Sequence, residues 1–414
     1  MYNMQKSTVR KSEGPKVLKK TEGSTQVGMR WGAAVTKFNV NVRKPNATDE
    51  LEELFGIGEL PLSEAEATVE LRGVPTAVVN ALRRVVTDEM VGYALKVSEN
   101  GFKAERTTEL YMLPQFVNQR IELMPLLQRP AAEAAARNLR IELNMTNTSA
   151  SAITVYAGDL RVVSGQISEP IFNPTFEIAT LQPGKCIVIE DIIISSGRGR
   201  DNAMFQVACC TSFRHLDIPQ YTDDEMRLSS GAAADLSGYK TSCLVSDPRW
   251  HELRLTLPVT GMDPKGDVRS ALEGACENIR ARLRLVIAAL EEPSGSTAPA
   301  GSMQFTVVSL EGGLVEAVLY APGETHTIGE LMRRAIFDVA PDVSYATYSL
   351  SAHEKRMVIT VRQLGVESEI TAIFAEAAQM AIATFDDIAL ALGPSPSQGV
   401  VANKYTDLPG RGGK

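Results

Sequence analysis

The chain has 414 residues, a length that allows two or three domains, each with a hydrophobic core of its own. Apolar residues make up 44% and charged residues 22%, values of ordinary globular proteins that exclude a disordered or fibrous chain. The net charge of −8 is unevenly spread, because residues 1–44 carry ten Lys or Arg and two Glu. That local +8 leaves −16 for the remainder, and such an acidic body argues against extensive contacts with nucleic-acid phosphates.

Residues 1–44 are predicted to form a basic flexible arm. Their Lys, Ser and Gly content is typical of a solvated tail, and their charge also suits contact with nucleic acid or an acidic partner. The first twenty residues lack the apolar core of a secretory signal, and no run approaches the ~20 apolar residues that span a bilayer. We therefore expect a soluble protein of the cytosol or nucleus.

The five cysteines are scattered along the chain without a CxxC pair, and no paired His lies at ligand spacing. Neither a disulfide framework nor a zinc finger is therefore expected, and most of the cysteines are predicted to be small buried residues. They are Cys186, Cys209, Cys210, Cys243 and Cys276.

A strand followed by a helix is predicted for residues 67–90. Polar and apolar residues alternate over 67–74, as in a half-buried strand, and Pro75 suits the first turn of a helix. Apolar residues then recur every three or four positions, at Val78, Val79, Leu82, Val85, Val86 and Met90. A longer helix over 266–292 has one apolar stripe, formed by Val268, Leu272, Ala275, Ile279, Leu283, Val286, Ile287 and Leu290.

Between these two helices the chain resembles a series of strands. β-branched and aromatic residues are concentrated in 138–145, 153–160, 185–196, 205–213 and 251–259, and turn signals such as QPGK separate several of these segments. We predict a mostly β domain, residues 127–250, inserted between helices of another domain. Within its strands, one of Cys209 and Cys210 is expected to face inward and the other outward.

The stretch EEPSGSTAPAGS at 291–302 is rich in Pro, Gly, Ser and Ala, which predicts an inter-domain linker at 292–302. Behind it, 303–321 is typical of a strand pair with a turn at Gly312 and Gly313, and 325–339 of an amphipathic helix. Residues 357–365 alternate as a strand, and 367–392 form a long helix with an apolar face. The last residues, 393–414, are predicted to be a flexible tail.

Both halves therefore share the order strand, short helix, strand and long helix. Each half presents amphipathic helices whose apolar stripes need a partner, and the other half is the obvious one. A linker of about twelve residues spans ~20 Å as a coil, which permits pairing within one chain. Such a tether also raises the local concentration of each half to the millimolar range.

The first half resembles the larger partner in the assembly-platform family of cellular RNA polymerases, which comprises the bacterial alpha subunit, archaeal subunits D and L and the matching eukaryotic third-largest and eleventh subunits. The segment VELRGVPTAVVNALRRVVTDEM contains the signature Asn-Ala-Leu-Arg-Arg as residues 80–84. In FVNQRIELMPL, Arg120 and Pro125 match the family, whereas Gln119 replaces its His. Residues 154–160, 170–208 and 251–272 follow in the family's order.

The second half is similar to the smaller partner of that family. ETHTIGELMRRAIFDVAPDVSYATYSL, residues 324–350, matches its His-Thr-Leu-Gly-Asn-Leu helix, with Ile328 for Leu and Glu330 for Asn. Together the matches cover about residues 65–390. Fusion of both partners in one chain resembles the arrangement in large nucleocytoplasmic DNA viruses, which transcribe with their own polymerases.

The resemblance implies an α+β fold with two alpha-subunit-type dimerisation domains paired within one chain, plus the inserted β domain. The first dimerisation domain takes residues 45–126 and 251–291, and the second takes 303–392. We expect a non-catalytic assembly scaffold of a multisubunit DNA-dependent RNA polymerase. The two largest catalytic subunits would dock on it, smaller subunits would join them, and no separate smaller-partner subunit would be needed. DNA would be contacted only indirectly.

The resemblance also implies a set of partner-interface residues: Asn80, Leu82, Arg83, Arg84, Arg120, His326, Thr327, Leu331, Arg333 and Arg334. Some family members carry a cysteine cluster after the Ile-Pro-Leu-like turn, but residues 126–140 contain no cysteine. We expect no catalytic residue, zinc, iron–sulfur cluster or other cofactor. A viral protein of this kind would be found in the virion and in the host cytoplasm or virus factory.

Other interpretations of these residues stay open. Arg83 and Arg84 also fit two solvated arginines on an outer helix face, and His326 fits a helix-start residue packed at the heterodimer core. The basic arm permits a stand-alone nucleic-acid-binding transcription factor instead of a scaffold. Cys209 or Cys210 with His215 permits a small-molecule enzyme.

Two further motifs have a chemical and a structural interpretation. The carboxylates of Asp386 and Asp387, or of 223–225, are predicted to be a charged helix face or turn rather than a metal site. SGRGR at 196–200 is predicted to be an ordinary β turn rather than a phosphate cradle, since no helix clearly follows it.

Overall fold

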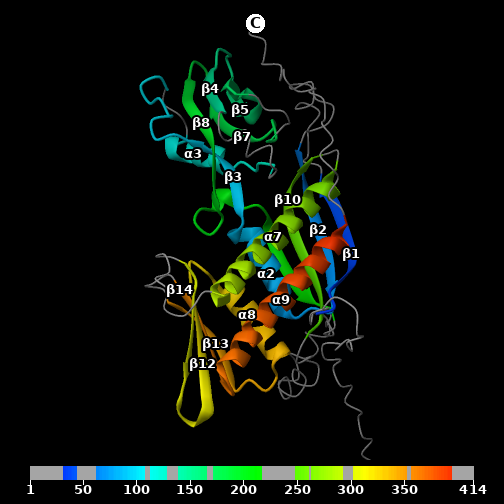
Figure 1. Ribbon diagram of the computed structural model, residues 1–414. Helices are drawn as coiled ribbons and strands as arrows, with labels where there is room; N and C mark the ends of the chain where they lie inside the picture. The colour runs from blue at the N-terminus through cyan, green and yellow to red at the C-terminus, as the bar shows by residue number, and fades with distance from the viewer. Residues whose placement is uncertain are drawn as a thin grey trace, which may run out of the picture. The chain divides into compact units, whose positions relative to one another are not determined.

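The computed structural model describes residues 31–43, 62–107, 112–127, 139–165, 171–216, 248–260, 263–291, 302–351 and 356–393 (Figure 1). The chain divides into two compact units, and each is described by itself. Unit 1 comprises residues 1–34, 72–78 and 279–388, and unit 2 comprises residues 35–71, 79–278 and 389–414. Residues 292–301 of the predicted linker, the tail from 394 and the first 30 residues lie outside the described ranges.

Unit 1 is built on a four-stranded antiparallel sheet in the order β11-β12-β14-β13. The predicted turn at Gly312 and Gly313 is confirmed: both residues have positive φ angles, of 77° and 73°, and they connect β11 to β12. The strands are Gln304–Ser309, Leu314–Pro322, Tyr345–Ser351 and Arg356–Leu364 for β11, β12, β13 and β14.

Helices α8 and α9 cover one face of this sheet. α8 (His326–Val339) packs against β13 and β14, and the Phe305 ring of β11 meets the Phe374 ring of α9 edge to face, with centroids 5.1 Å apart. α9 is Glu367–Leu392, and the predicted apolar faces of both helices are buried. Gly329 keeps α8 close to the sheet, because a Cβ there would lie 2.5 Å from Tyr348 Cδ2.

Unit 2 contains a second four-stranded sheet, in the order β1-β2-β10-β9. The strands are Ala34–Arg43, Leu62–Arg72, Trp250–Thr260 and Cys209–His215 for β1, β2, β10 and β9. The helix predicted after Pro75 is present as α2 (Thr76–Arg84), which continues into a π-helical turn, η1 (Val85–Glu89). The predicted long helix is α7 (Pro264–Glu291), whose apolar stripe is largely buried.

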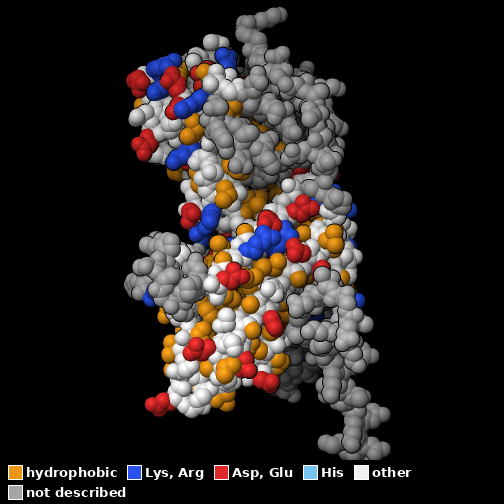
Figure 2. All heavy atoms as spheres, in the orientation of Figure 1, with side chains coloured by type: hydrophobic (Ala, Val, Ile, Leu, Met, Phe, Trp, Pro, Cys, Tyr) orange, Lys and Arg blue, Asp and Glu red, His pale blue; other side chains and the backbone are white. Residues whose placement is uncertain are grey.

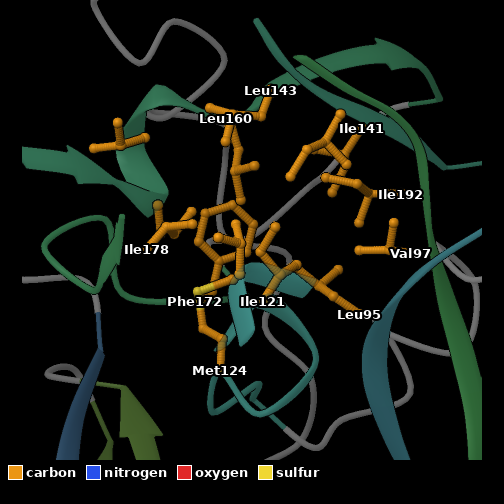
Figure 3. Close-up of a cluster of buried hydrophobic side chains, with 14 of the residues drawn as sticks. Leu95, Val97, Ile121, Met124, Ile141, Leu143, Leu160, Phe172, Ile178 and Ile192 are labelled. Carbon is orange, nitrogen blue, oxygen red and sulfur yellow. The ribbon is translucent and has the colours of Figure 1, made fainter. Parts of the chain in front are cut away.

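The remaining strands of unit 2 form a sheet in the order β3-β8-β4-β6 and a two-stranded sheet, β5-β7. Together with α3 (Pro114–Glu122) they enclose one cluster of buried apolar side chains (Figure 3). Leu95 from β3, Ile121 from α3, Ile141 from β4 and Ile192 from β8 converge there around Phe172. The strands are Val91–Val97, Arg140–Thr146, Ile153–Tyr156, Arg161–Ser164, Glu177–Leu181 and Cys186–Arg198 for β3 to β8.

Strand pairing groups three segments across the limits of the predicted domains, which stay predictions. β3 and α3, which the sequence analysis assigned to the first dimerisation domain, contribute to the core of the β-rich sheet instead. β9 was assigned to the inserted domain, but it pairs with β10 across His251↔His215 and Leu253↔Phe213. The predicted basic flexible arm includes residues that form β1, so the prediction of a flexible chain is wrong for Ala34–Arg43. β3, α3, β4, β5, β7 and β8 therefore share one core.

Candidate partner interface

α2 presents two arginines whose positions are fixed by neighbouring side chains. Nε and Nη2 of Arg83 both donate to Asn80 Oδ1 at 3.2 Å, three residues earlier on the helix. Nη2 of Arg84 lies 3.2 Å from Oε1 of Glu89, whose side chain is buried. This geometry holds both guanidinium groups at the surface of the helix.

α8 carries a matching pair of arginines in unit 1. Nε and Nη2 of Arg333 donate to the two carboxylate oxygens of Glu330 at 2.8 and 2.6 Å, and this hydrogen bonding raises the pKa of Arg333. Arg334 pairs with Asp338, with Nη2 3.0 Å from Oδ1. As in α2, the first arginine bonds three residues back and the second bonds forward.

The second arginine of each pair contacts a carboxylate further along its helix, and the sequence spacing of that contact differs by one residue between α2 and α8. Arg334 reaches a carboxylate four residues on, as in a regular α-helix, whereas Arg84 reaches one five residues on. The π-helical turn explains the difference, because the Met90 amide donates to the Val85 carbonyl five residues back, at 3.0 Å. The spacing of apolar residues in the sequence does not predict that turn.

The other predicted interface residues fall into two groups. Leu82, Thr327 and Leu331 are buried within the chain, so they contribute to internal packing and are closed to a separate protein. His326 was predicted to have a core or a capping role at a helix start; it begins α8 as expected, and because it is exposed, only the packed-core role is wrong. Its ring lies against Tyr348 of β13, and the hydroxyl of Thr325 caps the helix by accepting from the Thr327 amide at 3.2 Å.

Arg120 lies on the exposed face of α3 and donates to the Ile178 carbonyl at 3.5 Å. Leu113, Phe116 and Leu123 follow the same side of this helix and are also exposed. The predicted interface residues thus lie on three helices, α2, α3 and α8.

Sequence reasoning missed two ion pairs that connect α7 with the second half of the chain inside unit 1. Arg282 of α7 donates to Glu324, with Nε 3.0 Å from each carboxylate oxygen, and both side chains are largely buried. Arg280 pairs with Asp386 of α9. These partners are 42 and 106 residues apart in sequence, so no local pattern could have identified them. The prediction that Asp386 belongs to a charged helix face is consistent with this contact.

Trp31, just before β1, is the other residue that sequence reasoning overlooked. It is 2% exposed, and its Nε1 donates to Oδ2 of Asp338 at 2.7 Å. Asp338 therefore bonds both Trp31 and Arg334. The backbone beside Trp31 is tightly placed, because a Cβ on Gly73 would lie 2.2 Å from the Gly32 carbonyl oxygen.

The structure offers little for cysteine catalysis. Cys209 and Cys210 are both exposed, so the predicted inward and outward alternation is wrong; Cys210 has a φ of 51° beside an irregularity in the β9–β10 pairing. Although Cys209 is exposed as a whole residue, partial desolvation of its thiol and the neighbouring Cys210 raise its pKa, which disfavours the thiolate. The His215 ring bonds to that of His251 on the neighbouring strand, with the Nδ1 atoms 2.9 Å apart.

Glu252 lies beside the histidine pair on β10. Burial raises the pKa of its carboxyl, but hydrogen bonds from Arg214 and Arg254 outweigh that effect, so the pKa is lowered overall.

Among the described residues, no group of three or more His, Cys, Asp or Glu is arranged to hold a metal ion. Residues 196–198 of SGRGR end strand β8 and pair with β3, so the predicted β turn is shifted to 198–201, where the Asp201 amide donates to the Arg198 carbonyl at 2.9 Å. No helix in the described ranges is long and apolar enough to cross a membrane.

Comparison with known proteins identifies relatives of this chain, although no model of a protein family matches it. The "DNA-directed RNA polymerase RPB3-11 homolog" of African swine fever virus strain Badajoz 1971 Vero-adapted is 34% identical over 357 residues. The match covers 85% of this chain and 94% of the viral protein. The homologue of isolate Warthog/Namibia/Wart80/1980 matches to the same extent.

These relatives place the chain in the class of non-catalytic subunits of DNA-directed RNA polymerases, which act in transcription. Within that class, the chain belongs to the family of RPB3-11 homologues, as the resemblance to fused platform subunits predicted.

Proposed function

We propose that this subunit is the assembly scaffold of its polymerase. Its two halves pair within one chain as a pseudo-heterodimer, and the two largest, catalytic subunits dock on the pair. The observation that carries the proposal is the matched arrangement of Arg83–Arg84 on α2 and Arg333–Arg334 on α8, each arginine held by a neighbouring acceptor. A family with fused RPB3-type and RPB11-type parts accounts for that repetition.

Pairing of the halves is supported by the contacts of α7 with the second half. Arg282 and Glu324 form a largely buried ion pair, and Arg280 reaches Asp386 of α9. Arg269 Nε also donates to the carbonyl of Leu392, at the end of α9, at 2.8 Å. A helix before the linker therefore bonds at three points to segments behind it, and a separate smaller-partner subunit is unnecessary.

The large subunits dock on the arginine guanidinium groups of α2 and α8 that neighbouring side chains already orient. A guanidinium that is already oriented by a neighbour loses less conformational entropy on binding, and its remaining N–H groups match the planar fork of a carboxylate. Arg83 suits this role best, because the Asn80 amide that holds it is neutral and leaves the charge of the guanidinium uncompensated. We expect acidic residues on the large subunits to meet α2 and α8.

Copurification of the native complex tests the proposal. Replacing Arg84 would leave the buried Glu89 without its cation, so Arg83→Glu is the cleaner variant. We expect it to lower recovery of the large subunits at least tenfold while the circular dichroism spectrum is retained. Arg161→Glu, at an exposed position on β6 and outside the three helices, is the charge-matched control.

Full recovery of the large subunits with Arg83→Glu would refute the assignment of α2. Isolation of the native subunit without any large polymerase subunit would refute the scaffold itself. The nucleic-acid-binding alternative makes a separate prediction: removal of residues 1–24 abolishes function through lost, salt-dependent DNA binding. The scaffold predicts that assembly survives this deletion. For a viral protein we expect the virion and the host cytoplasm or virus factory as its location.

A further inference from the structure

Exposed apolar side chains gather at one end of the sheet in unit 1. Val308, Glu316, Arg362 and Tyr345 lie opposite one another across the four strands and therefore share a face. Leu364, two residues beyond Arg362, points to the same side. Val308 is 52% exposed, Tyr345 45% and Leu364 65%, in contrast to the buried face beneath α8 and α9. We call the exposed side chains Val308, Leu310, Tyr345 and Leu364, together with the half-buried Leu314, the end patch.

The rim of the end patch is acidic. Arg362, which lies between Glu316 and Tyr345 on the same face, is already paired with Glu316 and stacked over the ring of Tyr345 at 5.5 Å. Exposed carboxylates lie next to its residues along the chain: Glu311 is in the β11–β12 turn, Asp342 precedes β13, and Glu367 and Glu369 begin α9, where Glu367 accepts from the Ser309 hydroxyl of β11 at 2.9 Å. The N-terminus of α9 offsets only about half a unit of their charge, so a negative surplus remains. The β11–β12 turn, at the bottom of Figure 1, lies at this end, where Figure 2 shows Asp and Glu side chains and no Lys or Arg on the face in view.

The sequence before Trp31 has the complementary chemistry. Residues 1–30 contain seven Lys or Arg and two Glu, and KVLKK at 16–20 sets two apolar residues among three lysines. Trp31 is buried in unit 1 and bonded to Asp338 near the end of α8. The basic segment therefore starts from a fixed point in the same unit as the end patch.

The lengths of chain allow the segment to reach the patch. Tyr345 follows Asp338 by seven residues, so the two are at most about 25 Å apart. Leu18 precedes Trp31 by thirteen residues, which extend to about 45 Å. We propose that residues 16–20 occupy the end patch of their own chain, with Val17 and Leu18 against the apolar side chains and the lysines facing the carboxylates. This occupancy is independent of docking by the large subunits.

The test uses a fluorescein-labelled peptide of residues 6–24 and protein that lacks residues 1–24, so that Trp31 is retained. Fluorescence anisotropy should show saturable binding that weakens between about 50 and 300 mM NaCl. The full-length chain should bind the peptide at least tenfold more weakly, because its tethered segment competes at an effective concentration in the millimolar range. Leu364→Lys should weaken peptide binding to the truncated protein at least tenfold.

Val163→Lys is the matched control, because Val163 is 61% exposed on β6 of unit 2 and lies outside the end patch; it should leave the affinity unchanged. A peptide with Val17→Ser and Leu18→Ser keeps its charge and should lose binding. Absent binding, equal affinity of the full-length and truncated proteins, or indifference to Leu364→Lys would each overturn the proposal. A dimer that Leu364→Lys dissociates would overturn it too, by assigning the patch to a second copy.

Discussion

Removal of the Arg282 guanidinium tests what holds α7 to the second half of the chain. The Arg282 and Glu324 side chains are 15% and 9% exposed, so Arg282→Met would leave a largely buried carboxylate without its cation. Breaking such a pair costs about 3–5 kcal/mol of unfolding free energy, and the residual exposure favours the lower end, about 3 kcal/mol. The exposed pair of Arg362 and Glu316 is the control, since pairs of that kind contribute about 0–1 kcal/mol.

Tryptophan fluorescence during urea unfolding is the appropriate assay. The chain has two tryptophans, and a Trp250→Phe background leaves Trp31, which is buried in unit 1, as the reporter. Arg282→Met combined with Glu324→Gln should recover about 1–2 kcal/mol of the loss, because a buried amide costs less than a buried charge. The reasoning is refuted if Arg282→Met costs no more than Arg362→Met, or if the double variant recovers nothing.

Three further changes have defined outcomes. Gly329→Ala should destabilise unit 1 by about 1–3 kcal/mol in the same assay, because the new Cβ has no space. The control is Gly274→Ala, which should be neutral or slightly stabilising, because the nearest atom to its new Cβ is a flexible methyl group 3.3 Å away. Trp31→Phe should cost about 1.5–3 kcal/mol through the lost bond to Asp338, measured by calorimetry; no change would contradict that role. Because the pKa of Glu252 is lowered in the folded protein, its stabilisation is present above the ordinary value of 4.5 and is lost as the pH falls below it. Glu252→Gln should therefore flatten the acid side of the stability profile of unit 2.

The helices were the most predictable part of the fold, because their signal is local. The apolar stripe of α7 repeats along most of the helix, and each predicted stripe position from Val268 to Val286 is buried. The turn at Gly312 and Gly313 was equally local, since two glycines between alternating segments permit positive φ angles.

The presence of a strand was easier to predict from the sequence than the identity of the strand with which it pairs. Val91–Val97 has the residues of a strand in any sheet, and its pairing with Cys186–Arg198 depends on contacts far along the chain. The same holds for Cys209–His215, which the sequence placed among its neighbours although it pairs with Trp250–Thr260. Register and partner are chosen by burial of one face, which a single strand's pattern does not identify.

The candidate interface was predicted by residue type but not by contact. The resemblance identified Arg83, Arg84, Arg333 and Arg334, yet the acceptors that hold them depend on helix geometry and tertiary packing. His326 shows the limit of carrying a role over from a motif, because its place at the start of α8 was correct and its burial was not.

The π-helical turn gives the arginine pair on α2 different contacts from the otherwise similar arginine pair on α8. Asp88 follows Arg84 by four residues, as Asp338 follows Arg334, yet Arg84 bonds to Glu89 because the turn contains one additional residue. Asp88 is thereby available to the segment after β8: its carbonyl accepts from the Arg200 amide at 3.0 Å, and its Oδ1 accepts from the Gln206 side chain at 3.4 Å. In unit 2 the sheet β3-β8-β4-β6 follows the π-helical turn directly, since β3 begins at Val91. The additional residue therefore lets the motif on α2 hold its arginine and also bond to the segment after β8, whereas Asp338 holds Arg334 and Trp31.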